Sequence, residues 1–282
     1  MTDKSGHDSN GSGGLPYAEV IGDPIIHSKS PLLHNFWLQK LQIEAEYRKT
    51  HVTPDGLAAY FLQRRADPDW LGCNVTLPHK IAVMDYTDDP GGVRERIGAM
   101  NTIACETGRP LVGTNTDAGG FLQPLIRDTW RGDHAVLIGA GGAARAILFA
   151  LSTFGVPRIT VMVRDVAKGR ALLDRAGLSG DVLALTDPVP AADLLVNSSP
   201  LGMTGKPPLE IDISHLGKHA TVYDIVYAPL ETPLLAQARA LGLKTIDGLE
   251  MLIGQAALAF DIFFDAQAPR EHDAELRALL MA

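Results

Sequence analysis

A glycine-rich turn between a strand-like segment and a helix-like segment constrains this chain most. Residues 135–138 are apolar, residues 139–145 read GAGGAAR, and residues 146–154 return to an apolar, helix-like sequence. A helix that begins directly after such a turn leaves its first N–H groups unpaired, and its dipole favours an anion there. Glycine at 139 allows the tight turn, and glycine at 141 leaves room for a phosphate. The pattern predicts a dinucleotide site, and the residues expected to face the pyrophosphate are Gly139, Ala140, Gly141, Gly142 and Ala143.

The rest of the chain alternates between strand-like and helix-like segments, which indicates an α/β fold. In the first part the expected strands are 17–21, 45–52, 71–77 and 101–104, and the expected helices are 31–41, 54–66 and 78–85. In the second part the expected strands are 135–138, 159–163, 194–197 and 221–224, with helices ending near Trp130 and covering 143–154, 166–176 and 233–241. This second run predicts a doubly wound, mostly parallel sheet. Residues 249–282 are strongly helical and can pack back on the first part.

Length, charge and hydropathy restrict the kinds of partner that the chain can have. The 282 residues, of which 46% are hydrophobic, are long for one domain and sufficient for two. The formal charge of −8 and the absence of basic clusters argue against a nucleic-acid partner. No apolar stretch approaches the ~20 residues of a membrane span, and the polar N-terminus lacks the apolar core of a signal peptide. We therefore expect a cytoplasmic protein with neither a membrane nor a nucleic acid as partner.

The N-terminal residues and the two cysteines add little chemistry. Residues 1–14 are polar and glycine-rich, so we expect a disordered tail there. Cys73 and Cys105 lie far apart in the sequence and match neither a disulfide framework nor a zinc pattern. Both thiols are expected to be reduced.

The end of the second strand of the dinucleotide unit should distinguish NADP from NAD. An NAD site usually places an acid there for the ribose hydroxyls, whereas an NADP site offers arginine or lysine to the extra phosphate. Here strand 159–163 is followed by Arg164 and Asp165, with Lys168 one helical step later. Arginine binds phosphate through two parallel charge-assisted hydrogen bonds, so we expect NADP(H), bound by Arg164 and Lys168. In the alternative, Asp165 binds the ribose of NAD and Arg164 is a surface charge.

Hydroxyl and amide side chains in the first part indicate a small-molecule site. Ser28 and Ser30 lie just before an expected helix. Ser30, followed by proline, also fits a helix N-cap, whereas Ser28 has no such explanation. In 71–77, strand alternation places Asn74 and Thr76 opposite the apolar residues, so this polar face is not expected to be core.

Lys80 is the first candidate for the chemistry itself. It falls in the first turn of the helix expected from Pro78, where a cation opposes the helix dipole and is not placed for stability. The alternative is a solvated surface lysine. Asn101 and Asp117 lie in turn-like segments, and Asp117 taken alone also fits a helix N-cap.

Eight segments together resemble one known family in their order and spacing. They are GDPIIHSKSPLLHN (22–35), NVTLPHK (74–80), GAMNT (98–102), GTNTDAGG (113–120), GAGGAAR (139–145), NSSPLGM (197–203), YDIVYAPLETPLL (223–235) and DGLEMLIGQAALAF (247–260). These motifs are similar to those of the shikimate dehydrogenase family, and they cover nearly the whole chain after the N-terminal residues. The resemblance implies NADPH-linked reduction of 3-dehydroshikimate to shikimate, a step towards the precursor of the aromatic amino acids.

The resemblance also implies an architecture and site residues. A discontinuous α/β substrate-binding domain, residues 15–115 and 249–282, would be hinged to a Rossmann-type domain, residues 116–248, with the active site in the cleft. Lys80 and Asp117 would be the catalytic pair. The other implied contacts are Ser28 and Ser30 at the substrate carboxylate, Tyr227 near it, Asn74, Thr76, Asn101 and Gln255 at the ring hydroxyls, and Gly248 at the cofactor.

Two positions depart from the family pattern. Val163, Arg164 and Asp165 stand where the family commonly has Asn-Arg-Thr, which weakens the case for NADP over NAD. Glu250 stands where glycine is usual. An acid pointing into the cleft would repel an anionic substrate, whereas an acid on a solvated face would not.

Three alternative functions come from different classes. NAD-dependent quinate/shikimate dehydrogenases often carry threonine at the second serine, so Ser30 favours shikimate. A nucleotide-sensing module without catalysis is disfavoured because Lys80 and Asp117 are both present. A metal-dependent hydrolase is disfavoured because the histidines lack ligand spacing, and we expect no metal. A homodimer is possible, although no residue pattern identifies an interface.

Overall fold

The first of two sheets is formed by the N-terminal part of the chain. The computed structural model describes residues 14–106 and 108–282, so all but the last residue of the expected 1–14 tail lies outside the described residues. The strands of this sheet are β1 (Tyr17–Gly22), β2 (Glu46–His51), β3 (Trp70–Val75), β4 (Thr102–Ala104) and β5 (Val112–Thr114). Their order is β2-β1-β3-β4-β5, with β1, β2 and β3 parallel and the last two pairings antiparallel.

Helices cover both faces of the first sheet. They are α1 (Ser30–Leu41), the 3-10 turn η1 (Pro54–Gly56), α2 (Leu57–Arg65), the 3-10 helix η2 (Ala82–Tyr86) and α3 (Val93–Arg96). Tyr60 and Phe61 of α2 pack in one core with Ile21 and Val75 of the strands. On the opposite face, Val20 packs against residues from the C-terminal part of the chain.

The second sheet has six parallel strands and the topology of a Rossmann fold. The strands are β6 (His134–Ile138), β7 (Arg158–Val163), β8 (Asp181–Ala184), β9 (Leu194–Asn197), β10 (Thr221–Asp224) and β11 (Lys244–Ile246), in the order β11-β10-β9-β6-β7-β8. Its helices are α5 (Gly142–Phe154), α6 (Val166–Arg175) and α7 (Pro233–Ala240). Residues of α5 and α6 pack on one face and residues of α7 on the other, as a doubly wound sheet requires.

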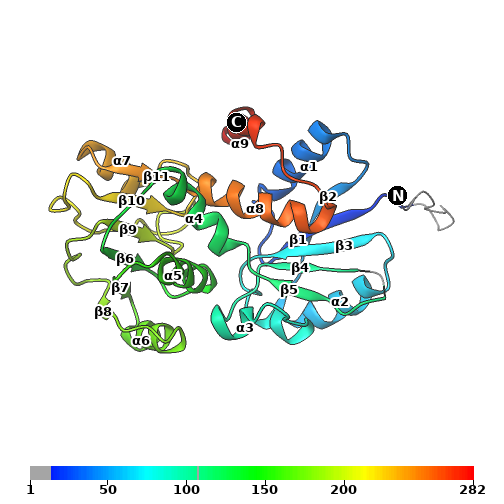
Figure 1. Ribbon diagram of the computed structural model, residues 1–282, viewed down its shortest axis with the longest axis horizontal. Coiled ribbons are helices and arrows are strands. Elements are labelled where there is room, and N and C mark those ends of the chain that lie inside the picture. Colours follow the sequence, from blue (N-terminus) through cyan, green and yellow to red (C-terminus); the bar gives the residue numbers. More distant parts are fainter. Residues whose placement is uncertain (1–13, 107) are drawn as a thin grey trace, which may run out of the picture.

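Two long helices connect the sheets. In Figure 1 the second sheet lies on the left and the first on the right, with α4 (Asp117–Arg127) and α8 (Gly248–Phe264) between them. These helices cross closely because both carry glycine at the contact: a Cβ on Gly120 would lie 2.4 Å from the amide nitrogen of Gln255, and one on Gly254 would lie 3.0 Å from the Cα of Gly120. The crossing brings Gln255 beside the helix that begins at Asp117.

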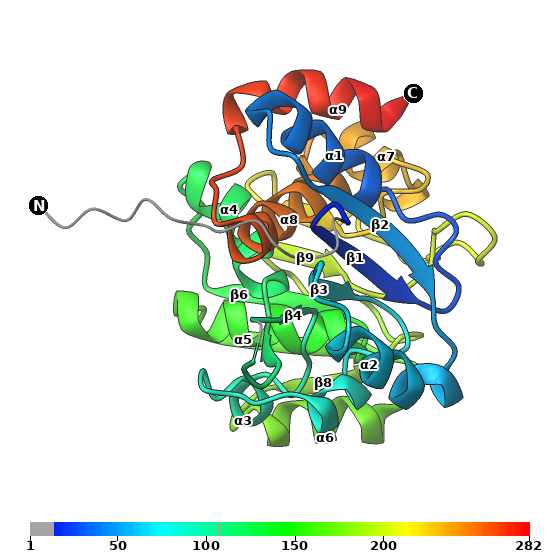
Figure 2. The same cartoon turned by 90° about the vertical axis from the view of Figure 1, so that its right-hand side faces the viewer.

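The C-terminal helices return to the first sheet, as the sequence predicted. After η3 (Arg270–His272), α9 (Asp273–Met281) lies beside α1 (Figure 2). Leu33 and Trp37 of α1 share a core with Phe260 of α8 and Leu276 of α9.

Several elements differ from the sequence prediction. The helix expected at 78–85 is wrong: residues 77–81 form turns, followed by η2. The carbonyl of Lys80, which in a helix would accept from residue 84, instead accepts from the amide of Met100 at 2.7 Å. The strands β5, β8 and β11 and the short α3 were not predicted. The strands β5, β8 and β11 contain no fully buried run of the kind that marks β9 and β10, and the four residues of α3 make only one turn.

Within residues 14–106 and 108–282, no helix is both long and apolar enough to cross a membrane.

Candidate active site

Lys80 and Asp117 form an ion pair where the first sheet meets α4. Lys80 lies in the turn after β3, and its ammonium contacts Asp117 Oδ2. Asp117 is the first residue of α4 and is only 4% exposed. A buried carboxylate needs such a partner, because its desolvation cost would otherwise be several kcal/mol. The prediction that Lys80 opposes a helix dipole was wrong, since no α-helix begins there; its place is explained by Asp117.

Asn101 holds the other oxygen of Asp117. Its Nδ2 lies 2.9 Å from Asp117 Oδ1, 2.9 Å from Thr116 Oγ1 and 3.3 Å from Gln255 Oε1. Its Oδ1 accepts from the amide of Thr116 at 2.7 Å. Asp117 is therefore held from both sides and does not cap α4; the side-chain oxygen of Asn115 accepts from the amide of Ala118 instead, at 3.2 Å.

Asn74 is buried, contrary to the expectation of a solvated polar face. It is 6% exposed, and each end of its amide is bonded within the protein. The Tyr47 hydroxyl donates to Asn74 Oδ1 at 2.6 Å, and Asn74 Nδ2 donates to Thr102 Oγ1 at 2.9 Å. Its hydrogen-bonding groups are engaged by neighbours, so Asn74 helps to hold the site together. Thr76 is only partly buried, and no hydrogen bond of its hydroxyl to a described residue is found.

The two serines lie at the start of α1 and keep their hydroxyls available. Lys29, not Ser30, occupies the N-cap position, and no side chain caps this helix, so the N-cap explanation of Ser30 was wrong. The Ser30 hydroxyl makes no hydrogen bond to a described residue, although its backbone amide donates to Ser28 Oγ at 3.3 Å. A polar group this deeply placed without a protein partner is suited to a ligand.

Tyr227 follows β10 and packs on the core that contains α1 residues such as Leu33. Burial raises the pKa of its hydroxyl, so Tyr227 stays neutral in the physiological range. No hydrogen bond among the described residues joins Ser28, Ser30 or Tyr227 to the Lys80–Asp117 pair.

The glycine loop has the geometry of a pyrophosphate cradle. Gly139 adopts φ +112°, a conformation that L side chains rarely take, and its amide donates to Met162 O at 3.0 Å. Gly141 is the N-cap of α5 without a side-chain cap, and a Cβ placed on it would have no heavy atom within 4 Å. The first-turn amides of α5 thus face open space, which fits a dinucleotide phosphate.

This loop also touches the ion pair. A Cβ on Gly142 would lie 3.2 Å from Cδ and 3.3 Å from Cβ of Lys80. The anion-binding end of α5 and the Lys80 side chain are therefore direct neighbours, although they belong to different sheets.

Arg164, Asp165 and Lys168 lie together after β7. Asp165 is the N-cap of α6: its Oδ1 accepts from the amides of Ala167 and Lys168 at 3.1 and 3.3 Å. Lys168 Nζ lies 3.8 Å from Asp165 Oδ2, and both side chains are exposed. Within the described part of the chain, Arg164 forms no ion pair. The cap accounts for Asp165, and Arg164 remains available for a phosphate.

Glu250 and Gly248 lie at the start of α8. Glu250 is held by Arg127 Nη1 at 2.8 Å and by Arg277 Nη1 at 3.3 Å, so its charge is paired. A Cβ on Gly248 would lie 2.4 Å from Ile225 O and 2.5 Å from Val226 O, so only glycine fits this contact between α8 and the chain after β10.

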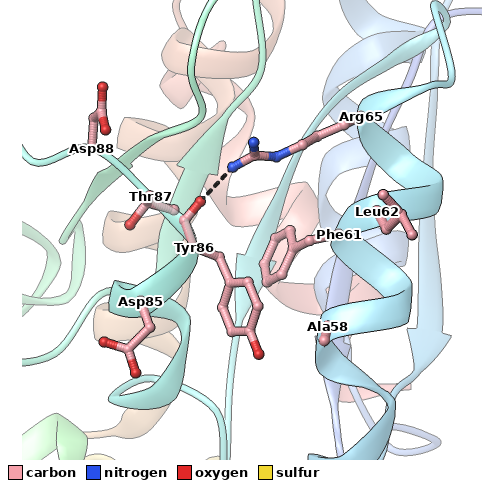
Figure 3. A pocket seen from close by; sticks show the side chains of 8 residues that line it. All are labelled: Ala58, Phe61, Leu62, Arg65, Asp85, Tyr86, Thr87 and Asp88. Atoms are coloured by element: carbon pink, nitrogen blue, oxygen red, sulfur yellow. Dashed lines mark hydrogen bonds between the residues drawn. The ribbon is translucent and has the colours of Figure 1, made fainter.

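A separate hollow lies between α2 and the chain around η2 (Figure 3). It has a volume of about 390 Å³, and Phe61, Arg65 and Tyr86 line it. Arg65 donates to the carbonyl of Tyr86 at 2.8 Å, the contact drawn in Figure 3. No residue of the Lys80 cluster takes part, so this hollow is not the candidate site.

Three residues join the cluster that the sequence did not single out. Thr102 and Thr116 stand inside two of the matching motifs, next to Asn101 and Asp117, and their hydroxyls complete the network around Asn101. Tyr47 comes from β2, where nothing in the local sequence marks it. A pairing of strands far apart in the chain brings it to Asn74.

Comparisons with known proteins agree with this geometry. The family model described as "Shikimate dehydrogenase substrate binding domain" matches residues 20–103, and the model "Shikimate 5'-dehydrogenase C-terminal domain" matches residues 248–275. A shikimate dehydrogenase (NADP(+)) of Sphingopyxis alaskensis is 57% identical over 95% of this chain and 97% of its own.

Solved structures give the same picture. A shikimate dehydrogenase in complex with NADP+ has a TM-score of 0.87 and 31% identity, over 95% of this chain and 96% of that one. The enzyme of Thermus thermophilus in complex with NADP(H) and shikimate has a TM-score of 0.83 and 33% identity, over 94% of this chain and 100% of that one.

Proposed function

The chain belongs to the shikimate dehydrogenase family, and on that premise we propose how its own residues reduce 3-dehydroshikimate to shikimate with NADPH. One observation carries the proposal. The ammonium of Lys80 is held by Asp117, and the Lys80 stem lies against Gly142 at the anion-binding end of α5. A proton donor and a nucleotide-binding turn thus meet at one point.

Lys80 supplies the proton in this proposal. NADPH, when bound at the glycine loop, would supply the hydride for the ketone carbon. Negative charge then develops on the carbonyl oxygen, where the ammonium at Lys80 Nζ stabilises it and transfers one proton. Asp117 keeps the ammonium aimed and charged before the transfer, because its carboxylate is fixed by Asn101. In the reverse direction the neutral amine takes the proton from the substrate hydroxyl.

The free hydroxyls supply the substrate contacts. Ser28 and Ser30 would bind the substrate carboxylate at the start of α1, with Tyr227 beside them. Thr76, Asn101 and Gln255 would orient the ring hydroxyls, and Asn74 would act through its neighbours. Several such contacts on rigid elements fix the orientation of the substrate, which is worth much of the rate.

The cofactor contacts follow from the second sheet. Gly139, Ala140, Gly141, Gly142 and Ala143 would hold the pyrophosphate, Arg164 and Lys168 the 2′-phosphate, and Gly248 would lie near the nicotinamide side. We divide the chain accordingly into a substrate-binding domain, residues 15–115 and 249–282, and a cofactor domain, residues 116–248.

The setting of the enzyme is also part of the proposal. We place it in the cytoplasm, in keeping with Cys73 and Cys105, which are both free. Light scattering will distinguish the homodimer considered above from a monomer of 30.2 kDa.

Four parallel assays test the proposal. Purified protein is given shikimate or quinate, each with NADP+ or NAD+, and the nicotinamide absorbance is followed. We expect fast turnover with shikimate and NADP+ only. Faster turnover with quinate and NAD+ would make it the catabolic relative, and inactivity in all four assays with retained NADPH binding would make it a sensor.

A further inference from the structure

A directed chain of hydrogen bonds runs from Tyr47 to Asp117. The Tyr47 hydroxyl donates to Asn74 Oδ1 at 2.6 Å, and Asn74 Nδ2 donates to Thr102 Oγ1 at 2.9 Å. Thr102 Oγ1 donates to Asn101 Oδ1 at 3.1 Å, and Asn101 Nδ2 donates to Asp117 Oδ1 at 2.9 Å. All five residues are buried.

The direction of this chain is set at both ends, by the Tyr47 hydroxyl that donates to Asn74 Oδ1 and by the amide of Thr116 that donates to Asn101 Oδ1 at 2.7 Å. An amide presents a donor end and an acceptor end, and one rotation decides which neighbour meets which end. Because the Tyr47 hydroxyl donates, the oxygen of Asn74 faces it and the Asn74 N–H groups face Thr102. Thr102 therefore accepts one hydrogen bond and gives its only hydrogen to Asn101 Oδ1. The N–H end of Asn101 is then left for Asp117.

Helix α1 holds Tyr47 in place. Asn35 Nδ2 donates to the carbonyl of Tyr47 at 2.8 Å, and the amide of Tyr47 donates to Asn35 Oδ1 at 2.9 Å. The ring of His34 stacks on the Tyr47 ring with centroids 3.9 Å apart and planes 4° apart. Burial lowers the pKa of His34 to about 3, so this ring is neutral under working conditions. Tyr47 is thus fixed by the helix that begins at Ser30.

We propose that Tyr47 is a positioning residue of this enzyme, which acts through Asn74 and Thr102 to keep the N–H end of Asn101 on Asp117. The inference rests on the proposed function. Without the Tyr47 hydroxyl, the Asn74 oxygen loses its donor, and the amide is held only through its Nδ2, which donates to Thr102 Oγ1 and to the carbonyl of Asn101 at 3.2 Å. Thr102 can then donate to Asn74, and Asn101 Oδ1 loses one donor and keeps the amide of Thr116, so the Asn101 amide is held less firmly against Asp117.

The test compares two buried tyrosines that each lose one hydroxyl. In Tyr47→Phe we expect kcat/KM for shikimate to fall about tenfold, the effect of one lost hydrogen bond to a charged or oriented group, with a higher KM. The dissociation constant of NADP+ should not change. Tyr60→Phe is the matched control, because the Tyr60 hydroxyl donates at 2.8 Å to a buried oxygen of Glu19, outside the site. If a variant merely contained less folded enzyme, its apparent kcat would fall and its KM would not change. A rise in KM therefore distinguishes a positioning role from a loss of stability.

A second variant keeps the test decisive if Tyr47→Phe fails to fold. Thr102→Val interrupts the same chain two steps later and should raise KM by a similar factor. The KM of the double variant should not exceed that of the single variant with the higher KM, because both substitutions interrupt the same series of hydrogen bonds. Wild-type kinetics in both variants, or equal losses in Tyr47→Phe and Tyr60→Phe, would overturn the inference. An inactive wild-type protein would instead overturn the proposed function.

Discussion

Lys80, the proposed proton donor, is held in place by its neighbours. The ion pair with Asp117 and the contact of Asn101 with Asp117 hold three polar groups in one geometry. The ammonium is only partly exposed, and so its interaction with a developing oxyanion is stronger than in water. The chemical step should therefore depend on this one nitrogen.

We expect Lys80→Ala to lower kcat by about 10²–10⁴-fold, the usual contribution of a positioned acid, with a much smaller change in KM. Steady-state kinetics with shikimate and NADP+ will measure the two constants. Lys80→Met, which keeps the length of the stem beside Gly142, is the control for packing. A near-normal kcat in either variant would remove Lys80 from the chemical step.

Arg164 should determine the choice of cofactor. It is available beside the capping Asp165, and arginine is suited to a 2′-phosphate. We expect Arg164→Ala to weaken the binding of NADP+ far more than that of NAD+, by about tenfold or more for a lost charge-assisted contact. Fluorescence titration with both nucleotides will show this difference. If the binding of NADP+ and of NAD+ weakens equally, residues other than Arg164 determine the preference for NADP+.

Single residues were predicted well where a short motif contains its own chemistry. The glycine loop was predicted from residues 139–145, because its turn and its helix are neighbours in the sequence. Lys80 was singled out through a helix that does not exist, so that argument was wrong, and its catalytic role stays a prediction that its ion pair with Asp117 supports. Tyr47 was missed because its partner Asn74 comes from another strand, a contact that no local pattern encodes.

At the scale of elements, buried polar side chains lie at the carboxyl ends of the parallel strands. Asp224 ends β10 and is fully buried, accepting from Asn197 Nδ2 at 3.0 Å and from Thr232 Oγ1 at 2.7 Å. Burial raises the pKa of its carboxyl to about 6 despite these donors. The folded protein therefore favours the protonated form of this carboxyl more than an exposed aspartate does.

The pH dependence of stability follows from that shift. An unfolded aspartate has a pKa near 3.9, so between about pH 4 and pH 6 the folded state binds more protons and stability falls as pH rises. Asp224→Asn keeps the acceptor oxygen without the charge. From urea unfolding at several pH values, we expect the free energy of unfolding of the variant to gain about 2 kcal/mol on the wild type between pH 4 and pH 7. Parallel pH profiles of the two proteins would contradict this.

Elements were predictable where they are long and periodic. Most strands and helices of the second sheet follow from buried apolar runs, whereas β5, β8 and β11 are largely exposed or half-buried and contain no such run. The turn at Lys80 departs from a helix because Met100, a distant residue, takes the Lys80 carbonyl. Tertiary contacts of this kind override local propensity.

At the scale of the whole molecule, the active groups come from both sheets and from the helices between them. Lys80 follows the first sheet, Gly142 belongs to the second, and Gln255 belongs to α8. Among the residues that the structure describes, no three His, Cys, Asp or Glu side chains lie close enough to hold a metal ion.

We expect activity to be independent of metals, because in the proposed function Lys80 fills the electrophilic role that a metal ion would otherwise have. Enzyme dialysed against EDTA should retain its full rate with shikimate and NADP+, and elemental analysis of the purified protein should find no stoichiometric metal. Loss of activity that added Mg²⁺ or Zn²⁺ restores would reverse this conclusion.

The return of the C-terminal helices to α1 determines the order in which a newly synthesised chain can fold. Trp37 of α1 emerges from the ribosome early, but its partners Phe260 and Leu276 emerge only after the whole second sheet. At ~5–20 residues per second this delay is on the order of ten seconds. The second sheet can therefore fold before the apolar face of α1 is covered. During translation that face stays exposed to solvent, and a chaperone would bind the nascent chain there.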